Sequence, residues 1–513
     1  MKIKPALLNL TAMILVAAIS NMPNTASAVK TIIDLRWSSP MYTHDVAVSG
    51  DGNYIAAVNT TGLYYFEAAS PTPLWWYEPP TTLLSIAISS NGEYVAAGDT
   101  SGQIHYFNQS TARRGSETTP TWTSNSMGGP IEKGTLAMSA NGNYTVVGGT
   151  GVSMWYYAEC HKRAGSGQDA TWTSSPLNAM DFRSVHISAD GEHVAGGGIR
   201  YGGGGFVAFY TNATKQLGYI QPTWNSYSQL EGAVTDLALS DDGYGLVAIT
   251  QNIMSLHYWA NATTLTDDPN ATWTNPGLFS SVDMNANGNK VVAGGNGAGS
   301  LHFWGNARGR SGIQPEDWVI MENTDVIDVA LSKDGNIIAA PCQTELLEYV
   351  AYFIGSAGET LGSYKLEQYC TMASISDDGG TIAIAGPGYD SLYVFNAYVD
   401  GTPPAINDVY QIPEKTSVYP DNTVAVFANV TDEGSGVKSV ILNYTTGNGT
   451  WFTQEMQPYT TDIYNGTIPA FPQGTNITYI VFAEDNADNL VCSEQLGYIL
   501  EYQVLPELAH ALD

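Results

Sequence analysis

The stretch LSIAISSNGEYVAAGDTSGQIHYFNQS, residues 84–110, is followed by PTWTSN at 120–125 and contains the unit from which most of this chain is built. It holds an apolar run, a Ser-x-Asn-Gly turn, a second apolar run, an aromatic run and a Trp-centred run. The same order recurs eight times, with turn glycines at Gly52, Gly92, Gly142, Gly191, Gly243, Gly288, Gly335 and Gly379. A recurrence at this length determines the architecture before any local interpretation.

Each turn glycine follows an Asp or an Asn, as in Asp51-Gly52 and Asn91-Gly92. These pairs between two apolar runs are the strongest short hairpin signal, because both residues tolerate a positive φ. Eight metal or ligand loops are the functional alternative. We expect hairpin turns.

Each copy offers four short strands, which in the second copy are 84–89, 94–99, 103–108 and 121–124. Four strands in a period of 40–50 residues are typical of one propeller blade. The pattern resembles WD-repeat-like and quinoprotein-like β-propellers, with the Ser-x-Asp-Gly turn common in prokaryotic versions. The resemblance covers residues 31–400 and implies a fold, since propellers host many unrelated functions.

The number of blades follows from the fourth strands. Trp-centred fourth strands follow copies one to six, and Tyr364 takes that place in copy seven. No such strand follows copy eight, but one precedes copy one at Trp37. We therefore predict an all-β fold with an eight-bladed propeller that the N-terminal strand closes, with seven blades as the alternative.

The two ends of the chain differ from the repeats. Residues 1–28 have a basic start, an apolar core and the cleavage signature Ala26-Ser27-Ala28, which predicts a secretory signal peptide. No later run approaches the roughly 20 apolar residues of a membrane span. The propeller is expected over 29–400, and the mature chain is expected to be secreted or to lie at the cell surface, without a transmembrane segment.

The chain carries 19 Lys and Arg against 49 Asp and Glu, a formal net charge of −30. This balance argues against nucleic acid as a partner, because nucleic acids bind basic patches. Seven basic residues nevertheless fall between third and fourth strands: Arg113, Arg114, Lys162, Arg163, Lys215, Arg308 and Arg310. They form either solvated loops or a rim that binds an anionic partner or a glycan.

Asn-x-Ser/Thr sequons are dense, which in an exported chain suggests a glycoprotein. They start at Asn59, Asn108, Asn143, Asn212, Asn261, Asn270, Asn429, Asn443, Asn448, Asn465 and Asn476. Chance occurrence in a chain rich in Asn, Ser and Thr is the alternative.

The sequence contains no recognisable set of catalytic residues. His105, His257 and His302 hold equivalent places in third strands of three blades, so they cannot meet on one metal ion. No zincin motif, phosphate-binding glycine loop or Gly-x-Ser-x-Gly nucleophile is present. No quinone-stacking or calcium-ligand set of the quinoprotein enzymes can be carried over, so we predict no catalytic residues and no organic cofactor.

The four cysteines allow three pairings in an exported chain. Cys342 ends the second strand of the seventh copy and Cys370 precedes the first strand of the eighth, on the same rim. We predict a disulfide between these two. Cys160 with Cys492 is the other pair, and unpaired thiols are the alternative.

A second domain begins after the stiff linker at 401–404, Gly-Thr-Pro-Pro. Seven alternating strands over 405–504 predict a β-sandwich. They are expected at 405–410, 423–430, 437–444, 450–457, 462–468, 476–483 and 491–503. The segments VTDEGSGV (430–437) and YIVFAEDNADN (479–489) resemble fibronectin-III and immunoglobulin-like domains of prokaryotic surface proteins. The resemblance implies an accessory, spacer or adhesive domain, and nothing is assigned to the tail at 505–513.

The same two segments contain an acidic cluster: Asp432, Glu433, Asp485 and Asp488. In such a sandwich the loops that hold them share one end. Carboxylates at short range repel each other, and Ca²⁺, with its oxygen ligands, relieves that repulsion. A calcium-stiffened joint is therefore one hypothesis, and solvated turn acids are the alternative.

These observations favour a non-catalytic secreted or cell-surface propeller protein that serves in binding, adhesion or envelope structure. Its expected partner is a protein, a glycan or an envelope polymer. An extracellular enzyme that uses the propeller channel, whether hydrolase, lyase or quinoprotein-like, and a self-assembling envelope or filament subunit are the alternatives.

Overall fold

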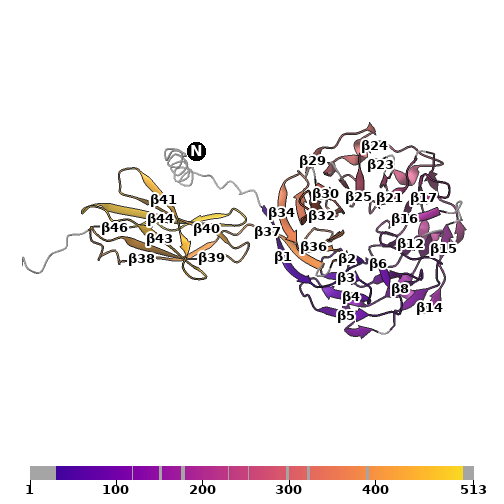
Figure 1. Cartoon of the computed structure of the whole chain (residues 1–513), viewed down its shortest axis with the longest axis horizontal. Coiled ribbons are helices and arrows are strands. Elements are labelled where there is room, and N and C mark those ends of the chain that lie inside the picture. The colour runs from indigo at the N-terminus through magenta and orange to yellow at the C-terminus, as the bar shows by residue number, and fades with distance from the viewer. Residues whose placement is uncertain are drawn as a thin grey trace, which may run out of the picture. The chain divides into compact units, whose positions relative to one another are not determined.

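The computed structural model describes residues 30–500, except 118, 150–152, 175–179, 229, 252–253, 296–299, 321–323 and 389–391. The chain divides into two compact units, Ile33–Ala397 and Met1–Ile32 with Tyr398–Asp513 (Figure 1). The predicted signal peptide at 1–28 and the tail at 505–513 lie outside the described residues. Among the described residues, no helix has the length and apolarity that crossing a membrane requires.

The unit Ile33–Ala397 is built from eight sheets, numbered here in chain order, each starting at an inner strand. Sheet 1 contains β2 (Asp45–Val48), β3 (Tyr54–Val58), β4 (Leu63–Glu67), β5 (Pro73–Tyr77) and β9 (Gly115–Glu117). Sheet 2 contains β6 (Leu83–Ile88), β7 (Val95–Asp99), β8 (Ile104–Phe107), β10 (Trp122–Ser124) and β14 (Gly165–Gln168). Sheet 3 contains β11 (Leu136–Met138), β12 (Thr145–Val147), β13 (Trp155–Tyr157), β15 (Trp172–Ser174) and β19 (Gly218–Ile220). Sheet 4 contains β16 (Met180–Ile187), β17 (Val194–Arg200), β18 (Gly205–Tyr210) and β20 (Trp224–Ser226).

The second half of this unit repeats the pattern. Sheet 5 contains β21 (Val234–Leu239), β22 (Gly245–Thr250), β23 (Ser255–Ala260), β24 (Trp273–Pro276) and β28 (Gly312–Ile313). Sheet 6 contains β25 (Phe279–Met284), β26 (Val291–Gly295), β27 (Leu301–Trp304) and β29 (Trp318–Ile320). Sheet 7 contains β30 (Thr324–Val326), β31 (Ala330–Leu331), β32 (Ile337–Thr344), β33 (Tyr349–Gly355) and β34 (Thr360–Leu366). Sheet 8 contains β35 (Met372–Ile375), β36 (Thr381–Ala385), β37 (Leu392–Asp400) and β1 (Lys30–Ser39).

Consecutive strands of a sheet are antiparallel, but four sheets gain a fifth, parallel strand from the next repeat. β9, β14, β19 and β28 each lie along the outer strand of the preceding sheet. Four short 3-10 helices directly precede these additions: η1 (Ser110–Ala112), η2 (Cys160–Lys162), η3 (Ala213–Lys215) and η5 (Ala307–Gly309). A fifth described 3-10 helix, η4 (Ala262–Thr264), precedes β24.

The Ser-x-Asx-Gly segments are turns, as predicted. In sheet 2 the Ser89 hydroxyl donates to Asn91 Oδ1 at 2.8 Å and accepts the N–H of Tyr94 at 3.0 Å. Gly92 has a φ of 72°, where a side chain would be strained. The Asx oxygen is thus used inside its own turn, which is a structural role.

Backbone hydrogen bonds join each turn to the turn of the next sheet. The donors and acceptors are Asp51 N to Ser90 O, Ser90 N to Ala140 O, Ala140 N to Ala189 O, Ala189 N to Asp241 O, Asp241 N to Ala286 O, Ala286 N to Lys333 O, Asp334 N to Asp377 O and Asp377 N to Gly50 O. The last bond returns from sheet 8 to sheet 1, so the eight sheets form a closed ring (Figure 1).

β1 completes sheet 8 at its outer edge, where the sequence placed Trp37. The Trp37 indole N–H donates to the carbonyl of Ala68 in sheet 1 at 2.8 Å. Trp75 and Trp122 make the same bond to the next sheet, at Ser110 and Cys160. The N-terminal strand therefore performs the same task as the other fourth strands.

Hydrophobic clusters fill the space between neighbouring sheets. Trp122, fully buried, stacks on Tyr106 of its own sheet and on Tyr157 of the next, with ring centroids 5.1 and 5.4 Å apart. Because each cluster is shared by two sheets, the apolar faces of every sheet are covered by its neighbours.

The predicted disulfide between Cys342 and Cys370 is not formed in the described part of the chain. Cys342 packs in the cluster between sheets 6 and 7, with Val326 and Leu331. Cys370 packs in the next cluster, between sheets 7 and 8, with Phe353. The two side chains lie on opposite faces of sheet 7, so the shared rim inferred from sequence does not bring them together.

The second unit contains two sheets. One holds β38 (Ala405–Ile412), β39 (Val424–Thr431), β42 (Gln457–Pro458) and β43 (Ile463–Ile468). The other holds β40 (Val437–Thr445), β41 (Trp451–Glu455), β44 (Asn476–Asp485), β45 (Leu490–Cys492) and β46 (Leu496–Ile499). One core takes residues from both, including Val426 and Ile468 from the first and Leu442 and Val481 from the second.

The strands of this unit follow the predicted ranges with two interruptions. The expected strand 450–457 divides into β41 and β42, and 491–503 divides into β45 and β46. The second interruption contains Ser493, whose hydroxyl accepts the N–H of Val481 at 3.0 Å and donates to the Glu494 carbonyl at 2.8 Å. These side-chain bonds replace regular ladder bonds at that point.

One predicted glycosylation site is enclosed. Asn443 lies in β40 and is only 2% exposed, so a glycan there would require the strand to open. The other ten predicted asparagines are exposed or half-buried: Asn59, Asn108, Asn143, Asn212, Asn261, Asn270, Asn429, Asn448, Asn465 and Asn476.

Candidate functional site

The inner strands of Ile33–Ala397 surround a cavity of about 430 Å³. Its lining includes three basic side chains, Lys133, Arg183 and Lys333, three acids, Asp236, Asp283 and Asp328, and His186. These groups come from five different sheets, so no single stretch of the sequence contains them.

The carboxylates of the inner strands bond to the next sheet. Asp45 Oδ2 accepts the N–H of Ile86 at 2.9 Å, and Asp236 Oδ2 accepts that of Val282 at 3.1 Å. Asp283 Oδ2 accepts the N–H of Leu331 at 2.8 Å.

Serine hydroxyls serve the same purpose elsewhere in the ring. The Ser184 hydroxyl accepts from Leu237 N at 3.3 Å, and the Ser374 hydroxyl accepts from Val48 N at 2.9 Å, which joins sheet 8 to sheet 1. The polar side chains of the inner strands are therefore inter-sheet clamps, and each satisfies a backbone donor that would otherwise be buried unpaired.

One repeated position in the sequence holds five of these clamps, whereas Asp283 and Ser374 stand two residues before the turn Asn or Ser of their copy. Asp45, Ser184, Asp236, Ser281 and Asp328 each stand four residues before the turn Ser or Asn of their copy. The side-chain oxygen of each accepts the backbone N–H of the residue that lies three positions before the turn residue of the next copy. Asp328, for example, accepts the N–H of Ala373 at 3.2 Å. An alignment of the eight copies by this column would have exposed the acids.

Lys133 spans the cavity. It comes from the loop before β11 in sheet 3, and its ammonium donates to Asp328 Oδ2 of sheet 7 at 3.0 Å and to the Thr371 carbonyl before sheet 8 at 3.2 Å. Burial acts to lower the pKa of Lys133, but the nearby Asp328 and Asp45 outweigh it and hold the pKa above its ordinary value. The lysine thus stays charged among the acids.

Burial changes the protonation of the cavity lining. It raises the pKa of Asp236 to about 6 and that of Asp283 to about 7, and it raises the pKa of Asp45, an inner-strand acid outside the lining, to about 6. It lowers the pKa of His186 to about 4, so this imidazole is neutral at pH 7. The cavity lining therefore carries both positive and negative side chains, and protonation neutralises some of the acids. Such a surface suits polar groups of either sign.

The three repeat-equivalent histidines lie apart, beside aromatic rings, as predicted. His105 in β8 contacts Asp99 at 3.1 Å and the Tyr77 hydroxyl at 3.1 Å. His257 stacks near Trp259, and His302 near Trp304. His257 and His302 pack within their own sheets, whereas His105 also contacts Tyr77 of the neighbouring sheet 1.

Most of the seven basic loop residues have structural partners. Arg113 lies over Trp75 and Phe107, and its Nε donates to the Asn108 carbonyl at 2.8 Å. Arg163 repeats this arrangement over Trp122 and Tyr157. The remaining contacts include Lys162 with Glu159, Lys215 with Glu192, Arg308 with Asp242 and Arg310 with Asp317. The proposed basic rim is therefore largely neutralised.

The two rims of the ring differ in polarity. In an antiparallel sheet, the loops between second and third strands emerge on the same rim as those between a fourth strand and the next first strand. We call this the loop rim; among the described residues it exposes Tyr42, Tyr201, Met254, Leu278, Leu346, Leu347 and Tyr369. The opposite rim, the turn rim, carries the Ser-x-Asx-Gly turns and the loops between third and fourth strands; among the described residues it exposes Tyr244 and Leu217.

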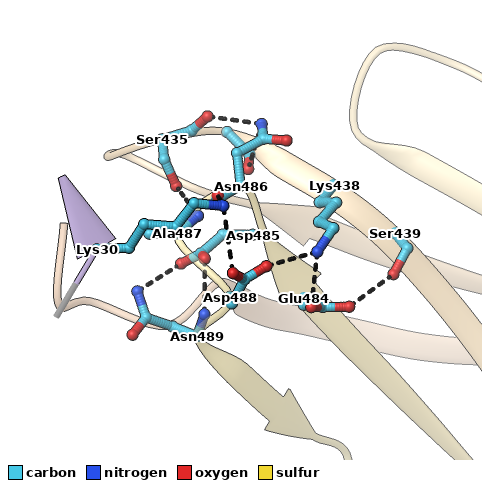
Figure 2. A network of polar contacts seen from close by, with 11 residues as sticks. Lys30, Ser435, Lys438, Ser439, Glu484, Asp485, Asn486, Ala487, Asp488 and Asn489 are labelled. Atoms are coloured by element: carbon cyan, nitrogen blue, oxygen red, sulfur yellow. Dashed lines mark hydrogen bonds and ion pairs between the residues drawn. The ribbon is translucent and has the colours of Figure 1, made fainter. Parts of the chain in front are cut away.

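The predicted acidic cluster is only partly assembled. Asp432 and Asp485 approach each other together with Asp400, which the sequence analysis missed. Glu433 is exposed, and Asp488 pairs instead with Lys30 at 3.2 Å and Lys438 at 2.5 Å (Figure 2). Asp400 was missed because it ends β37, outside both acidic segments.

Comparisons with known proteins address the fold. No protein-family model matches, and no curated protein is similar in sequence. The C-terminal WD40 domain of Sif2 is 13% identical, with a TM-score of 0.52 over 72% of this chain and 99% of that one. The β-propeller domain of Cps50 (Swd1) from Myceliophteria thermophila is 9% identical, with a TM-score of 0.48 over 71% and 99%.

At a sequence identity of 13%, the comparison with Sif2 supports only the fold. The TM-score of 0.52 with the WD40 domain of Sif2 supports the same overall fold. The residues Ile33–Ala397 form a WD-repeat-like β-propeller.

Proposed function

We propose that this chain is an exported, non-catalytic binding protein in which each of the eight sheets is one propeller blade. The second unit is an immunoglobulin- or fibronectin-III-like sandwich that serves as an accessory domain. The signal-peptide pattern at 1–28 and the dense sequons support export and glycosylation.

The loop rim carries this proposal. Its exposed tyrosine, methionine and leucine side chains are of the kinds that gather in the centre of protein interfaces. Leu346 and Leu347, 82% and 71% exposed, stand at the tip of the loop between β32 and β33. Exposed leucines at a loop tip have no role in the core, and they favour contact with a partner.

The clamps support a binding scaffold over an enzyme. Asp45, Asp236 and Asp283 each accept a backbone N–H of the neighbouring sheet. A carboxylate that holds the ring together is poorly placed to exchange protons with a substrate.

A protein is the partner that the loop rim favours. Its apolar side chains suit another apolar protein surface, while Arg183, exposed on β16, suits an acidic group at the channel mouth. Glycans and envelope polymers are outcomes that the experiment distinguishes.

The test places a photo-crosslinking amino acid at Leu346 of the full chain and incubates it with intact cell envelopes of the source organism. The control places it at Tyr219, which is equally exposed on the outer strand β19. We expect one protein adduct from Leu346 and none from Tyr219. The double variant Leu346→Asp, Leu347→Asp should abolish co-sedimentation with the envelopes at an unchanged melting temperature.

Equal cross-linking at both positions, or full binding by the double variant, would contradict the proposal. Adducts to the same chain would support the self-assembly alternative. Adducts lost after glycosidase treatment of the envelopes would identify a glycan as the partner.

A further inference from the structure

Three segments of the second unit bring three carboxylates together. Asp400 ends β37, Asp432 follows β39 directly, and Asp485 ends β44. One oxygen atom from each lies within 4.8 Å of the other two. Asp485 is fully buried, Asp400 is 5% exposed and Asp432 is half-buried, so solvent screens the first two charges little and the third in part.

The neighbours of the cluster provide hydrogen bonds but no positive charge. Asp400 accepts N–H bonds from Thr402 at 3.0 Å and Ser435 at 2.7 Å. Asp485 accepts bonds from the backbone and side chain of Asn489 at 2.8 and 2.9 Å. In the described part of the chain, none of the three aspartates forms an ion pair.

The two nearby lysines serve other acids. Lys30 and Lys438 both contact Asp488, and Lys438 also contacts Glu484 at 3.0 Å (Figure 2). Three carboxylates at short range therefore keep an uncompensated negative charge, which costs free energy in the folded state unless a cation joins them.

One oxygen of the cluster lacks a partner altogether. Asp432 Oδ2 accepts the N–H groups of Gly434 at 3.0 Å and Gly436 at 2.7 Å. Asp432 Oδ1 is buried and has no hydrogen-bond partner in the described structure. A buried carboxylate oxygen without a donor is rare in folded proteins, and it marks a place for a bound cation or water.

We propose that Asp400, Asp432 and Asp485 bind a Ca²⁺ ion, which goes beyond the partner-binding function. Ca²⁺ accepts six to eight oxygen ligands at 2.3–2.6 Å, so its ligand oxygens stand up to about 5 Å apart. That span accommodates oxygens within 4.8 Å of one another. Mg²⁺ requires a nearly ideal octahedron and usually keeps several of its waters, which fits three loop carboxylates less well.

The experiment measures Ca²⁺ binding to the full chain by calorimetry and by the melting temperature in CaCl₂ against EGTA. The test variant is Asp432→Asn, which keeps the shape of the side chain and removes a charge. The matched control is Asp488→Asn, which removes a nearby acid outside the cluster.

We expect the wild type and Asp488→Asn to bind Ca²⁺ and to melt at a higher temperature with it. Asp432→Asn should bind at least tenfold more weakly. In EGTA, Asp432→Asn should melt at the same temperature as the wild type or above it, because one repelling charge is gone. This second readout separates loss of the ion from loss of the fold.

Three results would overturn the proposal. They are no heat of binding at millimolar Ca²⁺, an unchanged affinity in Asp432→Asn, and Mg²⁺ binding as tight as that of Ca²⁺. If the full chain binds Ca²⁺ but does not bind the envelopes, the function proposed above is wrong and the proposed Ca²⁺ site is unaffected.

Discussion

At the scale of single residues, the inner-strand acids show how a propeller uses charge. Asp283 lies among buried groups and still offers both oxygens to backbone donors, at Met284 and Leu331. Those two bonds lower its pKa, but burial outweighs them and raises it to about 7. The residue therefore holds its proton close to neutral pH.

This gives a pH dependence with a definite sign. Because the folded pKa of Asp283 exceeds the unfolded value of 3.8, its contribution to the free energy of unfolding is fully present below pH 4 and is lost as pH rises towards 7. We expect the difference in unfolding free energy between the wild type and Asp283→Asn to fall by roughly 1–3 kcal/mol across that window. Urea unfolding at several pH values measures it.

His186 provides a control of opposite sign. Its folded pKa of about 4 lies below the ordinary 6.5, so its contribution is lost as pH falls from 6.5 to 4. The difference between the wild type and His186→Asn should therefore rise with pH. Equal slopes in the two variants would refute both assignments.

The cysteines make a second prediction at this scale. Burial raises the pKa of Cys160 to about 12, whereas Cys492 is exposed. The thiolate is the reactive form, so iodoacetamide at pH 8 should modify Cys492 at least about a hundredfold faster than Cys160 in the folded chain. Mass spectrometry of native and urea-treated samples checks this, and similar rates in native protein would show the expectation to be wrong.

At the scale of elements, β1 depends on one aromatic side chain. Trp37 is 8% exposed, packs on Phe66 with ring centroids 5.6 Å apart and donates to the Ala68 carbonyl. It is the contact that ties the outer strand of sheet 8 to sheet 1.

Replacing Trp37 should weaken the closure of the ring. We expect Trp37→Ala to lower the unfolding free energy by about 3–5 kcal/mol, through loss of a large buried ring. Trp37→Phe should cost about 1–3 kcal/mol, because it keeps an aromatic ring and leaves the Ala68 carbonyl unpaired. Urea unfolding followed by tryptophan fluorescence measures both.

Trp318→Phe is the matched control, because its indole also donates to the next sheet, at Ser356, but the ring is partly exposed. Its cost should be smaller than that of Trp37→Phe. If Trp318→Phe lowered the unfolding free energy more than Trp37→Phe does, the Trp37 contact would not have the special role in ring closure that we expect.

Most strands of the ring could be predicted from the repeat. The ranges expected in the second copy match β6, β7, β8 and β10 to within one or two residues, because apolar alternation and the turn glycine fix them. The fifth strands were not predicted, because Gly115–Glu117 and its equivalents are two to four residues long and too short to show a strand pattern.

The candidate sites were less readable. The sequence alone did not single out Asp45, Asp236 and Asp328. Each resembles an ordinary strand residue in its own copy, and only its recurrence four residues before the turn residue of several copies marks it. Asp400 could not be assigned from sequence, because 32 residues separate it from Asp432 and only the fold of β38 and β39 brings them together. Position in three dimensions, not residue type, defines both sets.

At the scale of the whole molecule, export predicts a pattern of modification. If the chain passes through an N-glycosylation pathway after folding, the exposed sequons at Asn212, Asn261 and Asn448 should carry glycans and the buried Asn443 should not. Glycopeptide mass spectrometry of protein from its own host measures the occupancy of each site. An occupied Asn443 would show that modification precedes folding of β40.

The closed ring also imposes an order in time. β1 leaves the ribosome before every other strand described, yet its neighbour in sheet 8, β37, begins at Leu392 and is the last strand of the ring to be made. The intervening sheets can pack in succession as they appear, while the first strand waits without its partner for about 350 residues of synthesis. The strand that the cell makes first is the one that folding uses last, so a nascent chain of this protein needs protection at its beginning until its ring is complete.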